Sequence, residues 1–254
     1  MSELWTPAEI TTALWLDAAD SATVAVDGSG DVVQWDDKSG NARDATDSAT
    51  SGRPSLVLWP LKTALNAIDC KGQSGLTCVG FPSVDTSQPH VYAVVAKTQA
   101  IPVSHYLLTQ TFAGGSSRET ALFESVSSFG LSNQTAFGPR PSGSDAFYAR
   151  AAFSTDERII IGTAQVGTNA LRINGLQVDS RSTTLVNNST DALNIGQRAS
   201  GRVFDGLISE VVVLGYSDAQ AIEKLEGYLA HKWGLAGNLP AEHPYKSAAP
   251  VITP

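Results

Sequence analysis

The sequence lacks an excess of basic residues. It has 17 Lys and Arg against 25 Asp and Glu, and its formal net charge at pH 7 is −8. Proteins that bind nucleic acid or an acidic membrane surface through electrostatics present a basic patch or stripe. The sequence therefore predicts neither a nucleic-acid partner nor attachment to an anionic membrane.

Long apolar runs are also missing. Runs such as VVVL at 211–214 are far shorter than the roughly 20 apolar residues that a membrane-spanning helix needs. The first ten residues contain neither the positively charged stretch nor the apolar stretch of a secretory signal peptide. We therefore expect that the chain does not insert into a membrane. We also expect that it is made in the cytoplasm without a signal peptide, so that it would reach the outside of a cell only when the cell lyses.

Cysteine and histidine are scarce. Cys70 and Cys78 lie close enough in sequence for a disulfide across a hairpin, but a chain without a signal peptide is assembled in a reducing cytosol. Two free, mostly buried thiols are the favoured prediction, and the disulfide is the alternative. The four histidines show no metal-ligand spacing, so the sequence predicts no zinc site and no required cofactor.

What the sequence does contain is a series of alternating apolar and polar segments separated by turns. HVYAVVAK at 90–97 is a β-branched run typical of a fully buried inner strand. Asn174-Gly175 separates two alternating segments and supplies the positive φ angles of a type I′ hairpin. About a dozen strands can be counted in this way, which suits two antiparallel sheets packed face to face.

One amphipathic helix is predicted over residues 218–233. The segment 217–220 has the pattern of a capping box with Ser217 at the N-cap, and Gly234 is a natural C-terminal stop. Apolar residues between these signals recur at helical spacing and form a single face that predicts packing on a sheet. The residues of this face are Ala221, Ile222, Leu225, Leu229 and Trp233.

Motifs at both ends of the chain resemble a known superfamily. The motifs are LWLDA (14–18), WDDKSG (35–40), the hairpin at 174–175, FDG (204–206), ISEV (208–211) and GYLAHKWG (227–234). In these residues the chain resembles the concanavalin A-like lectin/glucanase superfamily, specifically the laminin-G-like domains of bacterial surface proteins and bacteriophage structural proteins. The resemblance implies an all-β jelly-roll sandwich of two antiparallel sheets. It says little about chemistry, because one fold hosts many functions.

A single sandwich domain is predicted over residues 1–239. The terminal motifs belong to one fold, and no repeat or linker divides the chain. Residues 240–254 contain four prolines and are predicted to form an extended tail. We expect such a tail to lie against the surface or to reach toward a neighbouring protein.

Four residues are candidate ligand-binding residues. Trp35, Asp36 and Asp37 begin a polar loop, and Trp59 lies near a strand end, where an exposed ring would stack on a sugar face. Burial of Trp35 and Trp59 in the core is the favoured alternative, because large aromatic side chains are generally buried.

Asp27 and Asp31 lie in a glycine-containing loop. Asp and Gly are what any hairpin loop uses, and the spacing misses the calcium-loop pattern of alternating acids closed by a Glu. A hairpin loop is therefore the favoured interpretation. A calcium site at Asp27 and Asp31 stays open only because many relatives in the superfamily that the chain resembles bind calcium.

The residues predict no catalytic site. Superfamily enzymes that cleave β-glucans carry alternating carboxylates on one strand, which place an acid and a nucleophile about 5 Å apart. Here Asp36 and Asp37 are adjacent, so they would face opposite sides of a strand, and Glu124 and Glu210 are isolated in apolar strands. Because no nucleophile elbow or phosphate loop occurs either, we predict that the chain is not an enzyme.

The functions that remain are binding functions. The first prediction is a non-catalytic surface or virion structural protein that decorates a capsid or tail. It would bind capsid or tail proteins or other copies of itself, offer loops to host-surface glycans, and lie on the virion surface or outside the cell after release. A monomeric carbohydrate-binding lectin module is the alternative, and a glycoside hydrolase ranks third.

Overall fold

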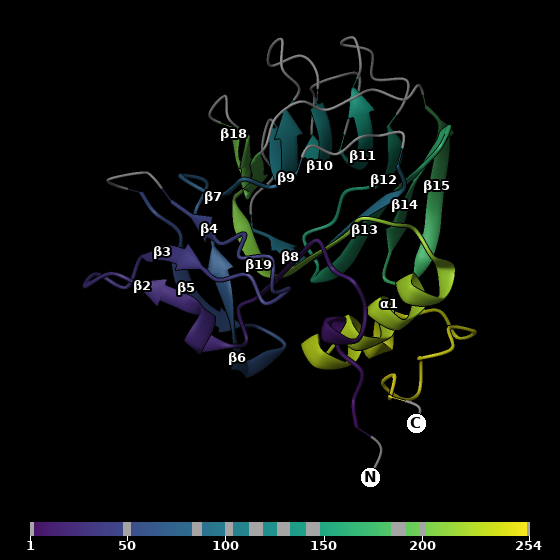
Figure 1. Ribbon diagram of the computed structural model, residues 1–254, viewed down its shortest axis with the longest axis horizontal. Coiled ribbons are helices and arrows are strands. Elements are labelled where there is room, and N and C mark those ends of the chain that lie inside the picture. Colours follow the sequence, from purple (N-terminus) through teal and green to yellow (C-terminus); the bar gives the residue numbers. More distant parts are fainter. Residues whose placement is uncertain are drawn as a thin grey trace.

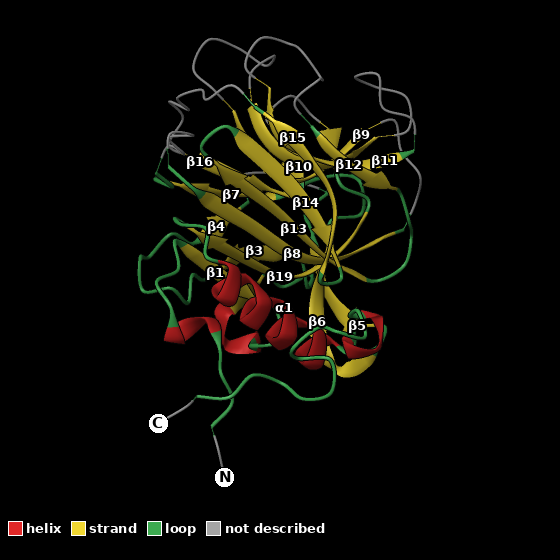
Figure 2. Cartoon of the chain, turned by 90° about the vertical axis from the view of Figure 1, so that its right-hand side faces the viewer, coloured by secondary structure: helices red, strands yellow, loops and turns green. Residues whose placement is uncertain are grey.

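The computed structural model describes residues 3–47, 52–82, 88–99, 104–111, 119–125, 133–140, 148–183, 192–198 and 202–252. Two antiparallel sheets stack face to face, and one α-helix covers the outer face of one of them (Figure 1 and Figure 2). The predicted all-β sandwich of two antiparallel sheets with one C-terminal helix is confirmed.

The sheet beneath the helix, called the central sheet, has eight strands. Seven follow one another in the order β15 (Leu176–Ser182), β14 (Thr168–Ile173), β13 (Arg158–Gln165), β8 (His90–Thr98), β19 (Gly206–Leu214), β6 (Lys62–Asp69) and β5 (Ser55–Trp59). The eighth strand, β1 (Leu14–Asp17), pairs with residues 210–213 of β19. The adjoining residues 207–208 of β19 pair with β6. The N-terminal strand thus lies beside a strand near the other end of the chain.

The other sheet, called the outer sheet, has nine strands. Their order is β12 (Ala149–Ala152), β11 (Gln134–Arg140), β10 (Glu119–Ser125), β9 (Ser104–Thr111), β16 (Ala192–Ile195), β7 (Leu76–Val79), β4 (Ala45–Thr46), β3 (Val32–Trp35) and β2 (Val24–Val26). A separate ribbon joins β17 (Gln197–Arg198) and β18 (Arg202–Val203), and three 3-10 turns are η1 (Pro7–Glu9), η2 (Ser21–Thr23) and η3 (Ala236–Asn238). There are more strands than expected because several are only two to four residues long.

The middle strands of the central sheet are buried on both faces. Val94 of β8 and Val211 of β19 face the outer sheet, whereas Val95 and Val212 beside them face the helix. A strand covered on both sides loses the alternation of a half-buried strand. Double burial is the reason why β8 and β19 consist of nearly continuous apolar runs, as predicted for residues 90–97.

The helix, α1, spans Ala219–Trp233. Its N-cap is Asp218, whose carboxylate accepts a hydrogen bond from the backbone N of Ala221 at 2.8 Å. The prediction of Ser217 at the cap is therefore wrong by one residue, since Asp serves at an N-cap as well as Ser does. Gly234 ends the helix in the left-handed conformation, as predicted. The apolar face buried against the central sheet includes Ile222, Leu225, Leu229 and Trp233.

The predicted hairpin turn is confirmed. Asn174 and Gly175 both have positive φ, 48° and 83°, and Ile173 pairs with Leu176 across the turn. Two positive φ angles in succession are the property of a type I′ turn.

The prediction of two free thiols is also confirmed. Cys70 and Cys78 are unbonded and buried between the sheets. Burial raises the pKa of both thiols. Among the described residues, no helix is both long and apolar enough to cross a membrane.

Residues 240–252 fold back onto α1. His243 Nε2 lies 3.2 Å from the buried carboxylate of Glu226, which Arg172 of β14 also contacts through two hydrogen bonds. Tyr245 packs so closely on Gly227 that a Cβ there would lie 2.4 Å from the Cβ of the tyrosine. The division of the chain at residue 239 stays a prediction, and the segment that follows is packed on the helix rather than extended away from it.

Candidate functional site

The polar loop after β3 holds β1 in place. Asp37 Oδ1 accepts hydrogen bonds from the backbone N of Trp15 at 3.0 Å and of Ser39 at 2.9 Å. Asp36 accepts one from the side chain of Gln34 at 2.7 Å. Both carboxylates proposed from the sequence as ligand-binding groups therefore take part in the hydrogen bonds of the loop itself. Whether either also meets a ligand stays a prediction.

Trp35 and Trp59 are both 0% exposed. Trp35 lies in the core between the sheets, and Trp59 packs edge to face on Trp233 with ring centroids 5.7 Å apart. A fully enclosed ring cannot stack on a sugar. The assignment of these two residues as ligand platforms is therefore wrong, and the alternative that both belong to the core is confirmed.

Asp27 and Asp31 make the contacts of a closed loop. Asp27 accepts from the backbone N of Ser29 at 2.8 Å and of Asp31 at 3.2 Å, and these bonds lower the pKa of its carboxyl group. Arg53 pairs with Asp27 at 3.0 Å, and Lys71 pairs with Asp31 at 3.2 Å. Within the described residues, no group of three or more His, Cys, Asp or Glu could hold a metal ion. Calcium at Asp27 and Asp31 stays a prediction.

A carboxylate that the sequence analysis treated as isolated, Glu210, lies fully buried beneath α1. Its Oε1 accepts from Trp15 Nε1 at 2.8 Å and from the Tyr228 hydroxyl at 2.9 Å. Its Oε2 accepts from Lys232 Nζ at 2.8 Å and from Trp233 Nε1 at 2.6 Å. Burial raises the pKa of Glu210, and the ammonium of Lys232 opposes that effect. Glu210 thereby joins β19 to β1 and to α1.

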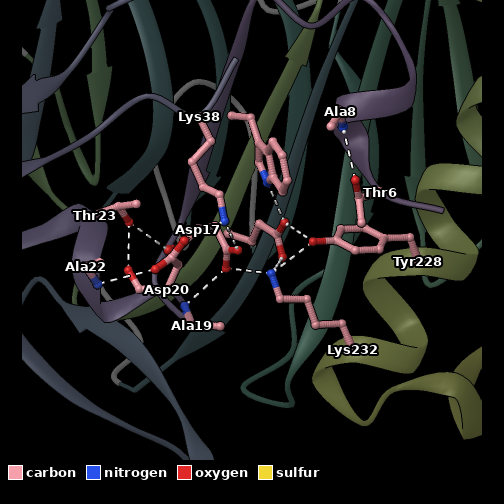
Figure 3. Close-up of polar contacts among 12 residues, drawn as sticks. Thr6, Ala8, Asp17, Ala19, Asp20, Ala22, Thr23, Lys38, Tyr228 and Lys232 are labelled. Atoms are coloured by element: carbon pink, nitrogen blue, oxygen red, sulfur yellow. Dashed lines mark hydrogen bonds and ion pairs between the residues drawn. The ribbon is translucent and has the colours of Figure 1, made fainter. Parts of the chain in front are cut away.

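Asp17 extends this cluster toward the surface (Figure 3). Lys232 Nζ lies 2.5 Å from Asp17 Oδ1 and 3.0 Å from the Tyr228 hydroxyl. Lys38 Nζ lies 3.0 Å from Asp17 Oδ2 and 2.9 Å from Asp20 Oδ2. Burial opposes the charge of Lys38, but the carboxylates of Asp20 and Asp17 raise the pKa of its ammonium above the usual value. The loop after β3 therefore contributes Lys38 to the site.

Asp17 and Glu210 are directly opposite each other in the pairing of β1 with β19. Opposed residues on paired strands project from the same face of the sheet. Two carboxylates thus lie side by side although nearly the whole chain separates them in sequence. A carboxylate pattern along one strand does not reveal this pair, because the spacing of residues does not show that the first strand pairs with the last.

A pocket of about 470 Å³ lies above this cluster, between α1, β1 and the two ends of the chain. Its walls include Trp5, Trp15, Asp17, Lys38, Tyr228 and Lys232, together with Leu4, Thr6, Lys62, His231 and Ala249. We call it the clasp pocket.

The clasp that gives the pocket its name consists of residues 3–6 paired with residues 249–252. Trp5 N donates to Pro250 O at 3.0 Å, Ile252 N donates to Glu3 O at 2.8 Å, and Leu4 bridges to Val251. The ends of the chain accordingly lie near each other (Figure 1). The clasp closes one side of the pocket, and the Trp5 ring packs edge to face on Tyr228.

A second pocket, of about 690 Å³, lies where β13 begins, next to the C-terminal end of α1. Among its lining residues, Glu157 pairs with Lys97 at 2.7 Å. Arg158 pairs with the buried carboxylate of Glu124 on the outer sheet at 2.5 Å, and Thr98 donates to the same carboxylate at 2.6 Å. Burial raises the pKa of Glu124. Glu157 and Arg158 of this pocket are thus used to join neighbouring strands and the two sheets.

No protein-family model and no curated protein matches the chain. Solved structures do match in fold. A sialidase of Trypanosoma rangeli, solved with sialic acid, has a TM-score of 0.60 at 13% identity; the match covers 91% of this chain and 36% of the sialidase. The chain thus spans about a third of that protein's length.

Two other solved structures are smaller. Domain 4 of a GH43 extracellular arabinanase from Geobacillus stearothermophilus, solved with arabinotriose, has a TM-score of 0.57 at 14% identity, over 83% of this chain and 95% of that domain. The binding domain of botulinum neurotoxin DC, in complex with SialylT, has a TM-score of 0.54 at 11% identity, over 86% of this chain and 51% of that one. At these identities the likeness shows a shared β-sandwich fold.

These comparisons correct one prediction. The chain was predicted not to be an enzyme, but proteins that share its fold include sialidases and a domain of an arabinanase. The absence of a carboxylate pattern along one strand therefore does not separate this chain from proteins that act on glycosidic bonds.

Proposed function

We propose that the chain is a carbohydrate-binding sandwich of the concanavalin A-like type and that it binds its ligand in the clasp pocket. Support from the fold comes from proteins that resemble it: the arabinanase domain was solved with arabinotriose, and the toxin binding domain with SialylT. The observation that carries the proposal is the composition of the pocket itself. Aromatic and apolar surfaces stand beside half-buried lysines around a space of ligand size.

The pocket suits a molecule with both apolar and polar surfaces. Leu4 and the partly exposed ring of Tyr228 offer apolar contact, while the amines of Lys38 and Lys62 offer hydrogen-bond donors. Sugar rings have this double character, because their C–H faces are apolar and their edges carry hydroxyl oxygens. A few fixed polar groups in an otherwise apolar pocket determine the orientation of the ligand.

Binding to a panel of oligosaccharides tests the proposal. We expect Lys38→Met and Tyr228→Ala to weaken binding of any glycan that the wild-type protein retains, by about tenfold or more. The matched control is Lys224→Met, because Lys224 lies on α1 but does not line the pocket. Equal binding by all variants would place the ligand elsewhere, and retention of no glycan would contradict the proposal.

Glycoside hydrolysis is a second candidate, favoured by the side-by-side carboxylates of Asp17 and Glu210. Asp17 lines the pocket, whereas Glu210 lies beneath it under two tryptophans and a tyrosine. We expect that, if glycans retained by the protein are cleaved, Asp17→Asn lowers turnover far more than it lowers binding. Reducing-end detection measures the turnover, and cleavage that persists in Asp17→Asn would remove Asp17 from the mechanism.

A role as a capsid or tail component, with a location on the virion surface or outside the cell, stays a proposal. Its test is copurification with particles at a fixed stoichiometry. Residues 243–252 contact α1 and the N-terminal segment, which matters for a truncation that tests docking to particles. Deleting residues 240–254 would disturb the clasp as well as a docking segment. Loss of particle binding therefore indicates a docking role only if the truncated protein keeps the thermal stability of the full chain.

A further inference from the structure

We infer that the clasp pocket selects glycans that carry a carboxylate, an inference that rests on the proposed carbohydrate-binding function of the same pocket. The inference rests on which hydrogen-bonding groups of the pocket already have partners within the protein. An ammonium group has three N–H donors, and a phenol has one donor and accepts as well. Each group can therefore be assigned its partners.

Two acceptor side chains of the pocket wall, Asp17 and Tyr228, already have donors within the protein. Asp17 Oδ1 accepts from Lys232 and from the backbone N of Ala19, and its Oδ2 accepts from Lys38. The Tyr228 hydroxyl donates to Glu210 and accepts from Lys232. Asp17 and Tyr228 are therefore engaged within the protein, which makes them weaker acceptors for a ligand hydroxyl than unbonded groups would be.

The donors, in contrast, are incompletely used. Lys232 directs its three donors at Asp17, Glu210 and Tyr228. Lys38 uses two, on Asp17 and Asp20, and so retains one. Lys62 uses one, on the carbonyl of His231 at 2.7 Å.

The amines that retain donors therefore belong to Lys38 and Lys62, which lie on different elements of the pocket wall. Lys38 comes from the loop after β3 and Lys62 from the start of β6. Both side chains are reachable by solvent, with that of Lys38 23% exposed. A ligand carboxylate accepts charge-assisted hydrogen bonds, and each of these two amines retains a donor for one.

The charge of the wall agrees with this assignment. Three lysines and one aspartate line the pocket, and Asp20, which does not line it, pairs with Lys38. The Glu210 carboxylate lies below them and holds Lys232. Lys62 has no carboxylate partner within ion-pair distance among the described residues, so its ammonium is available to an acidic ligand.

Matched pairs of glycans test the inference. Sialyllactose, trigalacturonate and a hyaluronan tetrasaccharide are each compared with their methyl esters, which keep the sugar and remove only the charge. We expect at least one acid to bind the wild-type protein about tenfold or more tightly than its ester, and the preference to weaken as the salt concentration rises.

Lys62→Met identifies the residue responsible. Lys62 is exposed and makes one hydrogen bond, so the variant should fold normally, and we expect its affinities for acid and ester to become equal. Lys224→Met is the control and should keep the preference. Equal binding of acid and ester by the wild-type protein would overturn the inference and leave the proposed function intact. A preference that survives Lys62→Met would overturn it too. Binding of neither acid nor ester by a protein that retains another glycan would overturn the inference alone, and retention of no glycan at all would contradict both proposals.

Discussion

Two buried glutamates, Glu124 and Glu210, lie on opposite faces of the central sheet and are held differently. On the side of the outer sheet, Glu124 pairs with Arg158 and accepts from Thr98. On the side of the helix, Glu210 accepts from two indoles, a phenol and an ammonium. Both carboxylates are 0% exposed, and burial raises the pKa of both.

The difference lies in what each arrangement connects. Glu124 and Arg158 link strands of the two stacked sheets, and Arg158 Nε has no hydrogen-bond partner among the described residues. Glu210 and its donors link the first strand, the last strand and α1, and Lys232 continues to Asp17 at the pocket. A buried ion pair is by itself weak evidence for stability. We infer that the pair between the sheets serves the sandwich alone, whereas the cluster under the helix also shapes the pocket.

The largest effect is expected from Glu210→Ala. Removing one partner of a buried charged cluster costs about 3–5 kcal/mol, because two indole N–H groups and the Tyr228 hydroxyl lose their acceptor and Lys232 loses one of its two carboxylates. Urea unfolding measures the loss, and Glu9→Gln, an exposed substitution, should change stability by less than about 0.5 kcal/mol.

Glu124→Ala sharpens the comparison between the two faces. We expect it to destabilise the protein as well, since Arg158 loses its carboxylate, but to leave ligand affinity unchanged at temperatures where the variant is folded. A Glu124→Ala protein that is folded and has lost ligand binding would show that the two faces are not functionally distinct.

Neighbouring isoleucines on β13 compare the apolar packing of the two faces. Ile160 is buried against the outer sheet and Ile161 against the helix. Each change to Ala is expected to cost about 2–5 kcal/mol by loss of buried area and creation of a cavity. A cost below about 1 kcal/mol for Ile161→Ala alone would mean that the helix layer contributes little to the fold.

A smaller effect concerns pH. Burial raises the pKa of Glu124 above its usual value of 4.5. Between pH 4.5 and the higher pKa of the folded state, Glu124 is therefore protonated in the folded protein and ionised in the unfolded protein. Stability from this group is therefore full below pH 4.5 and is lost as the pH rises toward the folded pKa. In Arg158→Met the opposing positive charge is gone, so the pKa should rise further.

We expect the destabilisation caused by Arg158→Met to be larger near about pH 8 than near about pH 5, by about 1 kcal/mol. Urea unfolding of wild-type and variant proteins at the two pH values measures it. A difference that is constant with pH, or larger at the acidic value, would contradict the direction of the shift.

Much of the fold could be predicted from local signals. The run in β8, the Asn174-Gly175 turn and the apolar face of α1 each follow from the side-chain period or from a φ requirement that few residues meet. The error of one residue at the helix start arose because Ser217 and Asp218 are both good caps, and only the structure shows which one accepts the bond from Ala221.

The site was less predictable because it depends on pairings between distant segments. The WDDKSG motif singled out Asp36 and Asp37, but the side chain of this loop that lines the pocket is that of Lys38. A tryptophan near a loop can be exposed or buried, so the residue type alone does not decide whether Trp35 belongs to the core or to a binding surface. Residues that form the pocket, such as Tyr228, belong to an amphipathic helix and could be placed only once the pairing of β1 with β19 was known.

The most direct test of the account is the location of a bound glycan. A structure of the protein with a retained oligosaccharide, or chemical-shift mapping on the labelled protein, should place the ligand in the clasp pocket, in contact with Lys38, Lys62 and Tyr228. A ligand bound on another surface, with these three residues unperturbed, would contradict the claim that the cluster under the helix supports the functional site.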